Sequence, residues 1–253
     1  MKLGVFQCDA SPVSPEDRLI ALEQALLESS LDLLLCPELF LSGYDAQADY
    51  SQLAEPQDGP FARAIADLAR KAGCVICYGY PERAGELIYN AAALIAPDGA
   101  LLANHRKRLP SPGSFEAGTF ANGPSVSFAD LGDWRIAIVI CYEVEFPESI
   151  RQAAQGGAQL VLIPTALGAD WGIVAEHVVP TRAFENGIWL AYADHAGTCR
   201  DLRFYGGSRV ADPLGRIVAQ TNDADHLISA DLTLDRVTYA QSRLPYLHDC
   251  QKL

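Results

Sequence analysis

The sequence predicts a mixed α/β fold in which two β-rich cores are covered by helices on the outside. Short apolar strands alternate with amphipathic helices, and turns rich in Gly, Pro and Asp separate them. No low-complexity linker or clear internal repeat interrupts this order. At 253 residues the chain can bury an ample core without disulfides or metals and could form one large domain or two small ones. Because no linker divides it, we expect residues 1–253 to form a single domain.

The first elements are a strand, a helix and a second strand. Leu3–Gln7 is apolar and is predicted to be a strand, and Pro15–Ser29 is predicted to be a helix because its apolar residues recur at helical spacing. The strand Leu31–Cys36 follows and is apolar except for one aspartate. Glu38 therefore lies just past the carboxyl end of a buried strand.

A helix and three strands come next. Pro60–Ala72 is predicted to be a helix, and the strands are Cys74–Tyr80, Ile88–Ile95 and Leu101–His105. The tight turn Ala96-Pro97-Asp98-Gly99 joins the last two strands, so they should form a β-hairpin.

The most informative segment of the chain is the apolar strand Trp134–Ile140, which ends at Cys141 in a polar turn. A helix is predicted to start near Pro147, with proline in its first turn. The other predicted elements are the strands Val126–Ala129, Leu160–Ile163, Ile188–Asp194, Ser208–Ala211, Ile217–Gln220 and Leu227–Asp231, and a helix over Glu176–Asn186.

Cys141 is a candidate nucleophile because of this position. A thiol between a strand and a helix lies close to unpaired backbone N–H groups and to the positive end of the helix dipole, which favour thiolate over thiol. The same N–H groups could hold an oxyanion. The alternative is a buried structural cysteine that ends a core strand.

Charge and cysteine content exclude several classes of function. The formal charge of −13 and the pI near 4.7 argue against nucleic acid or an anionic membrane as partner. No apolar stretch is long enough to span a membrane, so we expect a soluble protein. Seven cysteines, most of them in apolar runs, and no secretory signal favour the reducing cytoplasm.

Cys74 and Cys77 have the spacing of half a zinc site or of a redox pair, but no second pair exists. Their segment is continuously apolar, whereas redox pairs lie at helix starts. We expect a structural role; thiol redox chemistry is the alternative. The five histidines show no ligand spacing, so no metal is expected.

Two further segments place charged groups at the ends of apolar strands. Glu38 lies among apolar neighbours, which should raise its pKa towards the range useful for proton transfer. Arg106-Lys107-Arg108 is a basic run in an acidic protein. Each segment also has an ordinary interpretation, as a loop carboxylate and as the solvated exit of a hairpin.

The three segments together, in this order, resemble the nitrilase (carbon-nitrogen hydrolase) superfamily and its Glu-Lys-Cys triad. The matching motifs are Pro37-Glu38-Leu39-Phe40-Leu41-Ser42-Gly43-Tyr44, Arg106-Lys107 and Ile140-Cys141-Tyr142-Glu143-Val144-Glu145-Phe146-Pro147-Glu148. Further similarity lies at Glu116-x-x-x-Phe120-x-x-Gly123 and over 157–164, 182–186 and 207–215. The resemblance implies Glu38 as general base, Lys107 as the triad lysine, Cys141 as nucleophile and Glu116 as an assisting glutamate.

The same resemblance implies a four-layer α-β-β-α sandwich and a homodimer or higher homo-oligomer in which helices near the nucleophile form the contact. It implies hydrolysis of a small amide through a thioester, without metal or organic cofactor. The backbone N–H of Tyr142 would help Lys107 to stabilise the oxyanion. Tyr44, Thr165 and Trp171 are candidate substrate contacts, although Trp171 could instead anchor the helix that follows it.

The residues after Cys141 resemble the amidase-like branches, which favours an amide over a nitrile. A carbamoyl hydrolase or nitrilase with the same triad is the alternative, and a catalytically silent sandwich that binds a small molecule or a partner is the non-enzyme alternative. One departure concerns Lys107: family members often have an aromatic residue two positions before the lysine and a histidine shortly after it. Here His105 and Arg108-Leu109-Pro110 occupy that stretch.

Overall fold

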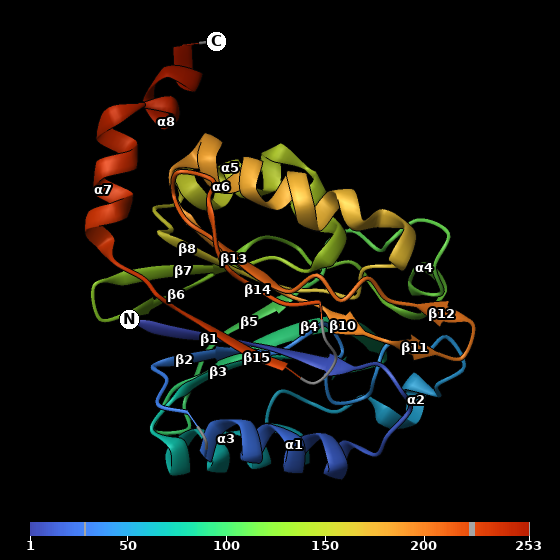
Figure 1. Ribbon diagram of the computed structural model, residues 1–253. Coiled ribbons are helices and arrows are strands. Elements are labelled where there is room, and N and C mark those ends of the chain that lie inside the picture. The colour runs from blue at the N-terminus through green and yellow to red at the C-terminus, as the bar shows by residue number, and fades with distance from the viewer. Residues whose placement is uncertain (28, 223–225, 253) are drawn as a thin grey trace.

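Two β-sheets are stacked at the centre of the molecule, and a pair of helices covers the outer face of each (Figure 1). The computed structural model describes residues 1–27, 29–222 and 226–252. The layers run helices, sheet, sheet, helices, which confirms the predicted four-layer α-β-β-α sandwich.

The first sheet has the strand order β10-β1-β2-β3-β4-β5, with β15 also paired to β1. The pairs β1–β2 and β2–β3 are parallel, whereas β3, β4 and β5 form antiparallel pairs. Its strands are β1 (Lys2–Asp9), β2 (Leu33–Leu35), β3 (Val75–Ala84), β4 (Leu87–Ile95), β5 (Leu101–Arg106), β10 (His195–Ala196) and β15 (His226–Asp231); α1 (Pro15–Leu27) and α3 (Pro60–Ala72) cover it.

The second sheet has the strand order β14-β13-β9-β8-β7-β6, and its central pairs β7–β8 and β8–β9 are parallel. Its strands are β6 (Ser127–Leu131), β7 (Trp134–Ile138), β8 (Leu160–Pro164), β9 (Trp189–Ala193), β13 (Arg209–Ala211) and β14 (Ile217–Gln220). The helices α5 (Pro147–Gln155) and α6 (Val179–Asn186) lie over its outer face (Figure 1).

Shorter elements complete the described chain. They are α2 (Tyr50–Leu53), α4 (Glu116–Thr119), the strands β11 (Thr198–Cys199) and β12 (Leu202–Arg203), the turns η1 (Cys141–Glu145), η2 (Ala169–Trp171), η3 (Val174–Val178) and η4 (Cys250–Lys252), and the C-terminal helices α7 (Leu234–Arg243) and α8 (Tyr246–Asp249). The last two helices extend beyond one edge of the sandwich (Figure 1).

Strand β2 shows how the sequence builds the layers, since successive side chains of a strand point to opposite faces. Leu33 and Leu35 pack in the core between the two sheets, together with Leu160 and Trp189 of the second sheet. Leu34 points the other way and packs in the core beneath α1 and α3. A strand that is buried on both faces has to be continuously apolar, as this one is.

Several predicted elements are confirmed, and the helix Pro60–Ala72 has the predicted bounds. Pro60 occupies its first turn, and Gly73 ends it in the left-handed conformation at φ 62°. The predicted hairpin exists as the antiparallel pair β4–β5. Helix α1 ends at Leu27, so Ser29 lies outside it, and residue 28 lies outside the described residues.

Other predictions were wrong in part. The helix expected over Glu176–Asn186 is a π-helical turn, η3, followed by α6 from Val179. Pro180 lacks an N–H and cannot complete a regular α-helical ladder through this point. The helix α7 was missed, because Val237 and Ala240 are its two buried residues and give a weak apolar pattern. Over the described residues, no helix is both long enough and apolar enough to span a membrane.

Candidate active site

Cys141 lies at the carboxyl end of β7 and is the first residue of η1. Strand β7 ends at Ile138, two residues before the predicted end, and α5 begins at Pro147 as predicted. The backbone of Cys141 is in the left-handed region at φ 49°. This conformation is uncommon for a residue with a side chain and is characteristic of functional sites.

The predicted thiolate character of Cys141 was wrong. The turn η1 separates the cysteine from α5, and only 8% of the residue is exposed. Burial raises the pKa of the Cys141 thiol well above its usual range; the negative charge of Glu38 raises it further, and Lys107 opposes the shift. The thiol therefore keeps its proton until a base removes it.

Glu38 is completely buried in the turn after β2. Its Oε1 accepts hydrogen bonds from Lys107 Nζ at 2.7 Å and from Asn90 Nδ2 at 2.6 Å. Its Oε2 is also buried and has no hydrogen-bond partner among the described residues. Burial raises the pKa of Glu38 to about 7 against the opposing effect of Lys107, which agrees with the shift predicted from its apolar neighbours.

Lys107 follows β5 directly and is 3% exposed. Besides its bond to Glu38, Nζ donates to Glu116 at 2.8 Å and to Ser111 Oγ at 3.2 Å. Burial by itself would lower the pKa of Lys107, but Glu38, Cys141 and Glu116 outweigh it and raise that pKa. The lysine is therefore an ammonium between two buried carboxylates.

Glu116 lies at the start of α4 and is fully buried. Its Oε1 accepts a hydrogen bond of 2.5 Å from Tyr44 Oη, and its Oε2 accepts one of 3.2 Å from the backbone N–H of Ser111. The ring of Tyr44 packs edge-on against Phe115 and Phe204, with centroid distances of 4.9 and 6.0 Å. The structure thus brings Tyr44 to the candidate site through Glu116.

The remaining predicted site residues lie in three different settings. Thr165 is buried at the end of β8, and its carbonyl oxygen accepts the N–H of Glu38 at 3.3 Å. Tyr142 follows Cys141 in η1, and its ring packs edge-on against Phe146. Trp171 is 65% exposed in η2, so it does not anchor the following helix in the core.

Two residues that contact Glu38 were not predicted. Asn90 lies in β4 and is 1% exposed; a lone amide within an apolar strand was the available signal in the sequence. His195 Nε2 donates to the backbone oxygen of Glu38 at 2.7 Å, and its Nδ1 lies 3.2 Å from Cys8 Sγ. Burial lowers the pKa of His195 to about 3, so its ring is neutral. Nothing in its local sequence indicates this contact.

Cys74 and Cys77 are both buried and unbridged; Cys77 lies in β3 of the first sheet, and Cys74 directly precedes that strand. Burial raises the pKa of Cys74 to about 12 and that of Cys77 further above its usual range. Neither environment produces a reactive thiolate. Within the described residues, no group of three or more His, Cys, Asp or Glu side chains is arranged to hold a metal ion.

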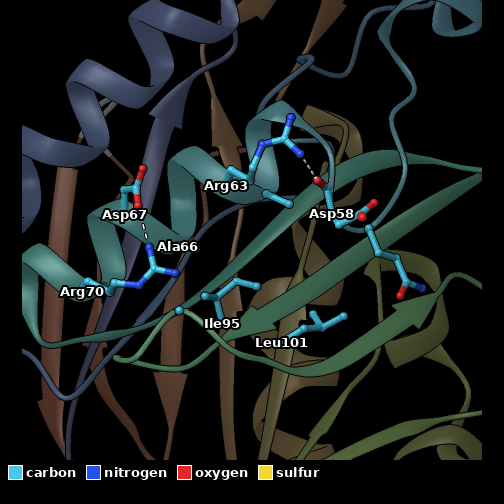
Figure 2. Close-up of a pocket in the computed structure, with 10 residues that line it drawn as sticks. Asp58, Arg63, Ala66, Asp67, Arg70, Ile95 and Leu101 are labelled. Atoms are coloured by element: carbon cyan, nitrogen blue, oxygen red, sulfur yellow. Dashed lines mark hydrogen bonds and ion pairs between the residues drawn. The ribbon is translucent and has the colours of Figure 1, made fainter.

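A groove of about 400 Å³ lies elsewhere, between α3 and the turn that joins β4 to β5 (Figure 2). Its charged side chains are engaged locally: Arg63 donates to the carbonyl of Asp58, and Arg70 is paired with Asp67 at 2.6 Å. Glu38, Lys107 and Cys141 are not among the residues that line it. The buried cluster around Cys141 is therefore the candidate active site.

The fold and this cluster define a carbon-nitrogen hydrolase. The sequence profile of the family described as "Carbon-nitrogen hydrolase" matches residues 4–241, and the chain belongs to this family. The family resemblance inferred from the three motifs is thereby confirmed.

Relatives of known name include hydrolases, amidases and nitrilases. The chain is 39% identical over 247 residues to the "Hydrolase in pqqF 5'region" of Pseudomonas protegens, covering 96% of this chain and 86% of the relative. It is 31% identical over 222 residues to an "(R)-stereoselective amidase" of a Pseudomonas species, covering 86% of this chain and 79% of the relative.

Solved structures of the amidase from Nesterenkonia sp. AN1 have the same fold. A cysteine-to-alanine mutant of that amidase in complex with butyramide matches with a TM-score of 0.86 and 34% identity, over 99% of this chain and 96% of that chain. A glutamate-to-glutamine mutant, with a TM-score of 0.86 and 34% identity over 99% of both chains, shows Michael addition of acrylamide at the active-site cysteine. The family and these structures make the present protein an enzyme that acts on C–N bonds.

Proposed function

We propose that this protein hydrolyses a small non-peptide amide to a carboxylic acid and ammonia, with Cys141 as nucleophile and Glu38 as general base. The observation that supports this most directly is the asymmetry of Glu38. One carboxylate oxygen is held by Lys107 and Asn90, and the other is buried without a partner among the described residues. An unpartnered oxygen on a carboxylate with a pKa of about 7 is suited to accepting a proton.

In the first step, Glu38 Oε2 takes the proton of the Cys141 thiol and sulfur attacks the amide carbonyl carbon. A new C–S bond forms while the carbonyl oxygen becomes an oxyanion. The Lys107 ammonium and the backbone N–H of Tyr142 stabilise this oxyanion. Losing one such donor typically costs roughly a hundredfold to a thousandfold in rate.

In the second step, the C–N bond breaks. Protonated Glu38 gives its proton to the departing nitrogen, which leaves as ammonia from a primary amide. The acyl group stays on Cys141 as a thioester. Glu38 then removes a proton from water, and the water oxygen attacks the thioester. The C–S bond breaks to release the acid, and Glu38 returns its proton to the Cys141 sulfur, which restores the thiol.

Glu116 and Tyr44 assist by maintaining the charge of Lys107. The two carboxylates on either side of Lys107 keep it protonated, and the short bond from Tyr44 fixes Glu116 in place. The ammonium then remains positive beside the thiolate and the oxyanion throughout the cycle.

The surroundings of Cys141 support a small acyl group. The cysteine is 8% exposed, and the rings of Tyr44, Phe115 and Phe204 pack together next to the Glu116 end of the site. The related amidase binds butyramide, so we propose a short aliphatic amide. Tyr44, Thr165 and Trp171 are the candidate substrate contacts.

We further propose a cytoplasmic protein of one domain, 1–253, that forms a homodimer or a higher homo-oligomer through helices near the nucleophile. Two aromatic side chains beside these helices support this contact: Phe184 of α6 and Tyr246 of α8 pack against each other and are 38% and 37% exposed. The net charge of −13 favours a small-molecule substrate over nucleic acid.

The decisive experiment measures ammonia release from a panel of small amides, nitriles and N-carbamoyl compounds by the wild type and by Cys141→Ala. Release from amides alone, absent in the variant, is the expected result. Release from nitriles or carbamoyl compounds instead would establish the alternative function, a nitrilase or a carbamoyl hydrolase with the same triad. Activity that persists in Cys141→Ala would overturn the mechanism. Failure of every compound, with Cys141 reacting with iodoacetamide no faster than the other cysteines, would favour the silent domain.

A further inference from the structure

Glu143 follows Cys141 by two residues and is completely buried. Its Oε2 accepts hydrogen bonds from the backbone N–H of Ile140 at 2.7 Å and from His105 Nε2 at 2.8 Å. Its Oε1 accepts two from Arg108, from Nε at 2.6 Å and from the backbone N–H at 3.3 Å. Four donors from three residues thus converge on one carboxylate.

These donors connect two segments that are far apart in the chain. His105 and Arg108 flank Lys107 on either side, whereas Glu143 and Ile140 flank Cys141. The carboxylate therefore joins the segment that contains the lysine to the segment that contains the cysteine. Arg108 also donates to Ser149 Oγ of α5 at 2.9 Å, which extends the connection to the helix after the nucleophile.

Glu143 also closes a ring of hydrogen bonds around Cys141. Its side chain accepts the N–H of Ile140, and its own backbone N–H donates to the carbonyl oxygen of Ile140 at 3.1 Å. Cys141 lies inside this ring at φ 49°. A left-handed conformation at a residue with a side chain persists only where the surrounding structure holds it.

The carboxylate is ionised at neutral pH. Burial acts to raise the pKa of Glu143, but His105, the N–H of Ile140 and Arg108 outweigh it and lower the pKa to about 2. An amide in the same place would offer one acceptor and two donors. Two of the four donors would then face an N–H₂ group.

We propose that Glu143, held by His105 and Arg108, is a positioning residue that fixes the Cys141 thiol relative to the Lys107 ammonium. This inference rests on the proposed function, in which Cys141 is the nucleophile. Glu143 makes its contacts with the neighbours of Lys107 and Cys141, so it acts through them. The departure from the family pattern around Lys107, with His105 before it and Arg108 after it, supplies the two side chains that hold the carboxylate.

The chain provides a matched control in Glu82. This glutamate is 1% exposed in β3 and accepts Arg106 at 2.6 and 2.8 Å and Asn104 Nδ2 at 2.7 Å. Arg106 is also a direct neighbour of Lys107. Within the described residues, however, the side-chain hydrogen bonds of Glu82 reach β5 and Gln57 and involve no residue of η1. Glu82→Gln therefore perturbs a buried ion pair beside the lysine without touching the cysteine segment.

The test compares Glu143→Gln with Glu82→Gln by three measurements: the rate of Cys141 alkylation by iodoacetamide, followed by mass spectrometry; kcat and KM; and the thermal midpoint. In Glu143→Gln we expect kcat and the alkylation rate to fall by at least about tenfold, because a small misplacement of a reacting group strongly slows its reaction. We expect KM to change little. In Glu82→Gln the thermal midpoint should fall about as far as it does in Glu143→Gln. The value of kcat and the alkylation rate should nevertheless stay within about twofold of the wild type.

Equal alkylation rates in Glu143→Gln and the wild type would overturn the proposal, as would equal losses in both variants. If Glu143→Gln does not fold, Arg108→Ala and His105→Leu replace it in the same measurements. His105→Gln keeps a hydrogen-bond donor and should restore part of the alkylation rate that is lost in His105→Leu. Alkylation needs no substrate, so a failure of the proposed amidase activity is distinguishable from a failure of positioning.

Discussion

Asn90 donates a hydrogen bond of 2.6 Å to Oε1 of Glu38, the same oxygen that Lys107 binds at 2.7 Å. Both donors favour the ionised carboxylate and lower its pKa, against the larger effect of burial. By occupying one oxygen, they leave the other available. The amide of β4 thus helps to decide both the pKa of the candidate base and the oxygen that takes the proton.

Replacing Asn90 should move the pH dependence of the reaction. In Asn90→Ala, a bond that lowers the pKa of Glu38 is lost, so that pKa rises and more of the base is protonated at neutral pH. We expect the acid limb of kcat/KM to shift to higher pH and the rate at pH 7 to fall. A pH–rate profile of wild type and variant checks this; a limb that stays in place, or moves to lower pH, contradicts it.

The wild-type profile follows from the same group. Glu38 must be ionised to accept a proton, and its pKa lies at about 7. As pH falls through this value, the base becomes protonated, and kcat/KM should fall in proportion to the fraction of Glu38 that is still ionised. Alkylation of Cys141 should show the same acid limb in the wild type and lose it in Glu38→Gln. A rate that is independent of pH between about 5.5 and 8 would refute the assignment of Glu38 as the base.

Removing Lys107 should destabilise the fold as well as stop catalysis. Lys107→Met leaves Glu38 and Glu116 buried without the cation that lies 2.7 and 2.8 Å from them. Breaking a buried pair of this kind costs about 3 to 5 kcal/mol of unfolding free energy. Urea denaturation measures the loss.

The matched control for this change is Lys71→Met. Lys71 is paired with Glu23 at 2.6 Å, but the two side chains are 58% and 36% exposed. An exposed pair contributes less than about 1 kcal/mol. Losses of unfolding free energy of similar size in the two variants would contradict the argument that the Lys107 ion pairs stabilise the fold more because they are buried.

Gly79 of β3 is predicted to be intolerant of any side chain. A Cβ atom there would lie 2.4 Å from the backbone nitrogen of Leu39 and 2.6 Å from the carbonyl oxygen of Pro37, the residues on either side of Glu38. Gly79→Ala should cost about 1 to 3 kcal/mol and displace the turn of Glu38, with a loss of activity. Gly118→Ala, where a Cβ meets nothing within 4 Å, should change stability by less than about 0.5 kcal/mol. Denaturation and kcat measurements decide, and similar behaviour of the two variants would contradict the packing argument.

The pattern of the sequence was sufficient for the main layers and for the principal site residues. Continuous apolar strands such as β2 indicate burial on both faces, and a helix with Pro60 at its start and Gly73 at its end specifies its own bounds. Charged or nucleophilic residues at strand ends identified Glu38, Lys107 and Cys141 as candidates. These features are local, because hydrophobic period and end signals depend on neighbours within a few residues.

The tertiary structure decided what each of these groups contacts and how it ionises. Glu38 and Lys107 are 69 residues apart, and the sequence contains no signal that pairs Glu38 with Asn90 or joins His105 and Arg108 to Glu143. The predicted thiolate of Cys141 was wrong for the same reason: its pKa depends on burial between two sheets and on charges from three segments. Periodicity reports which residues are buried, whereas hydrogen-bond partners and electrostatic fields depend on how the buried layers meet.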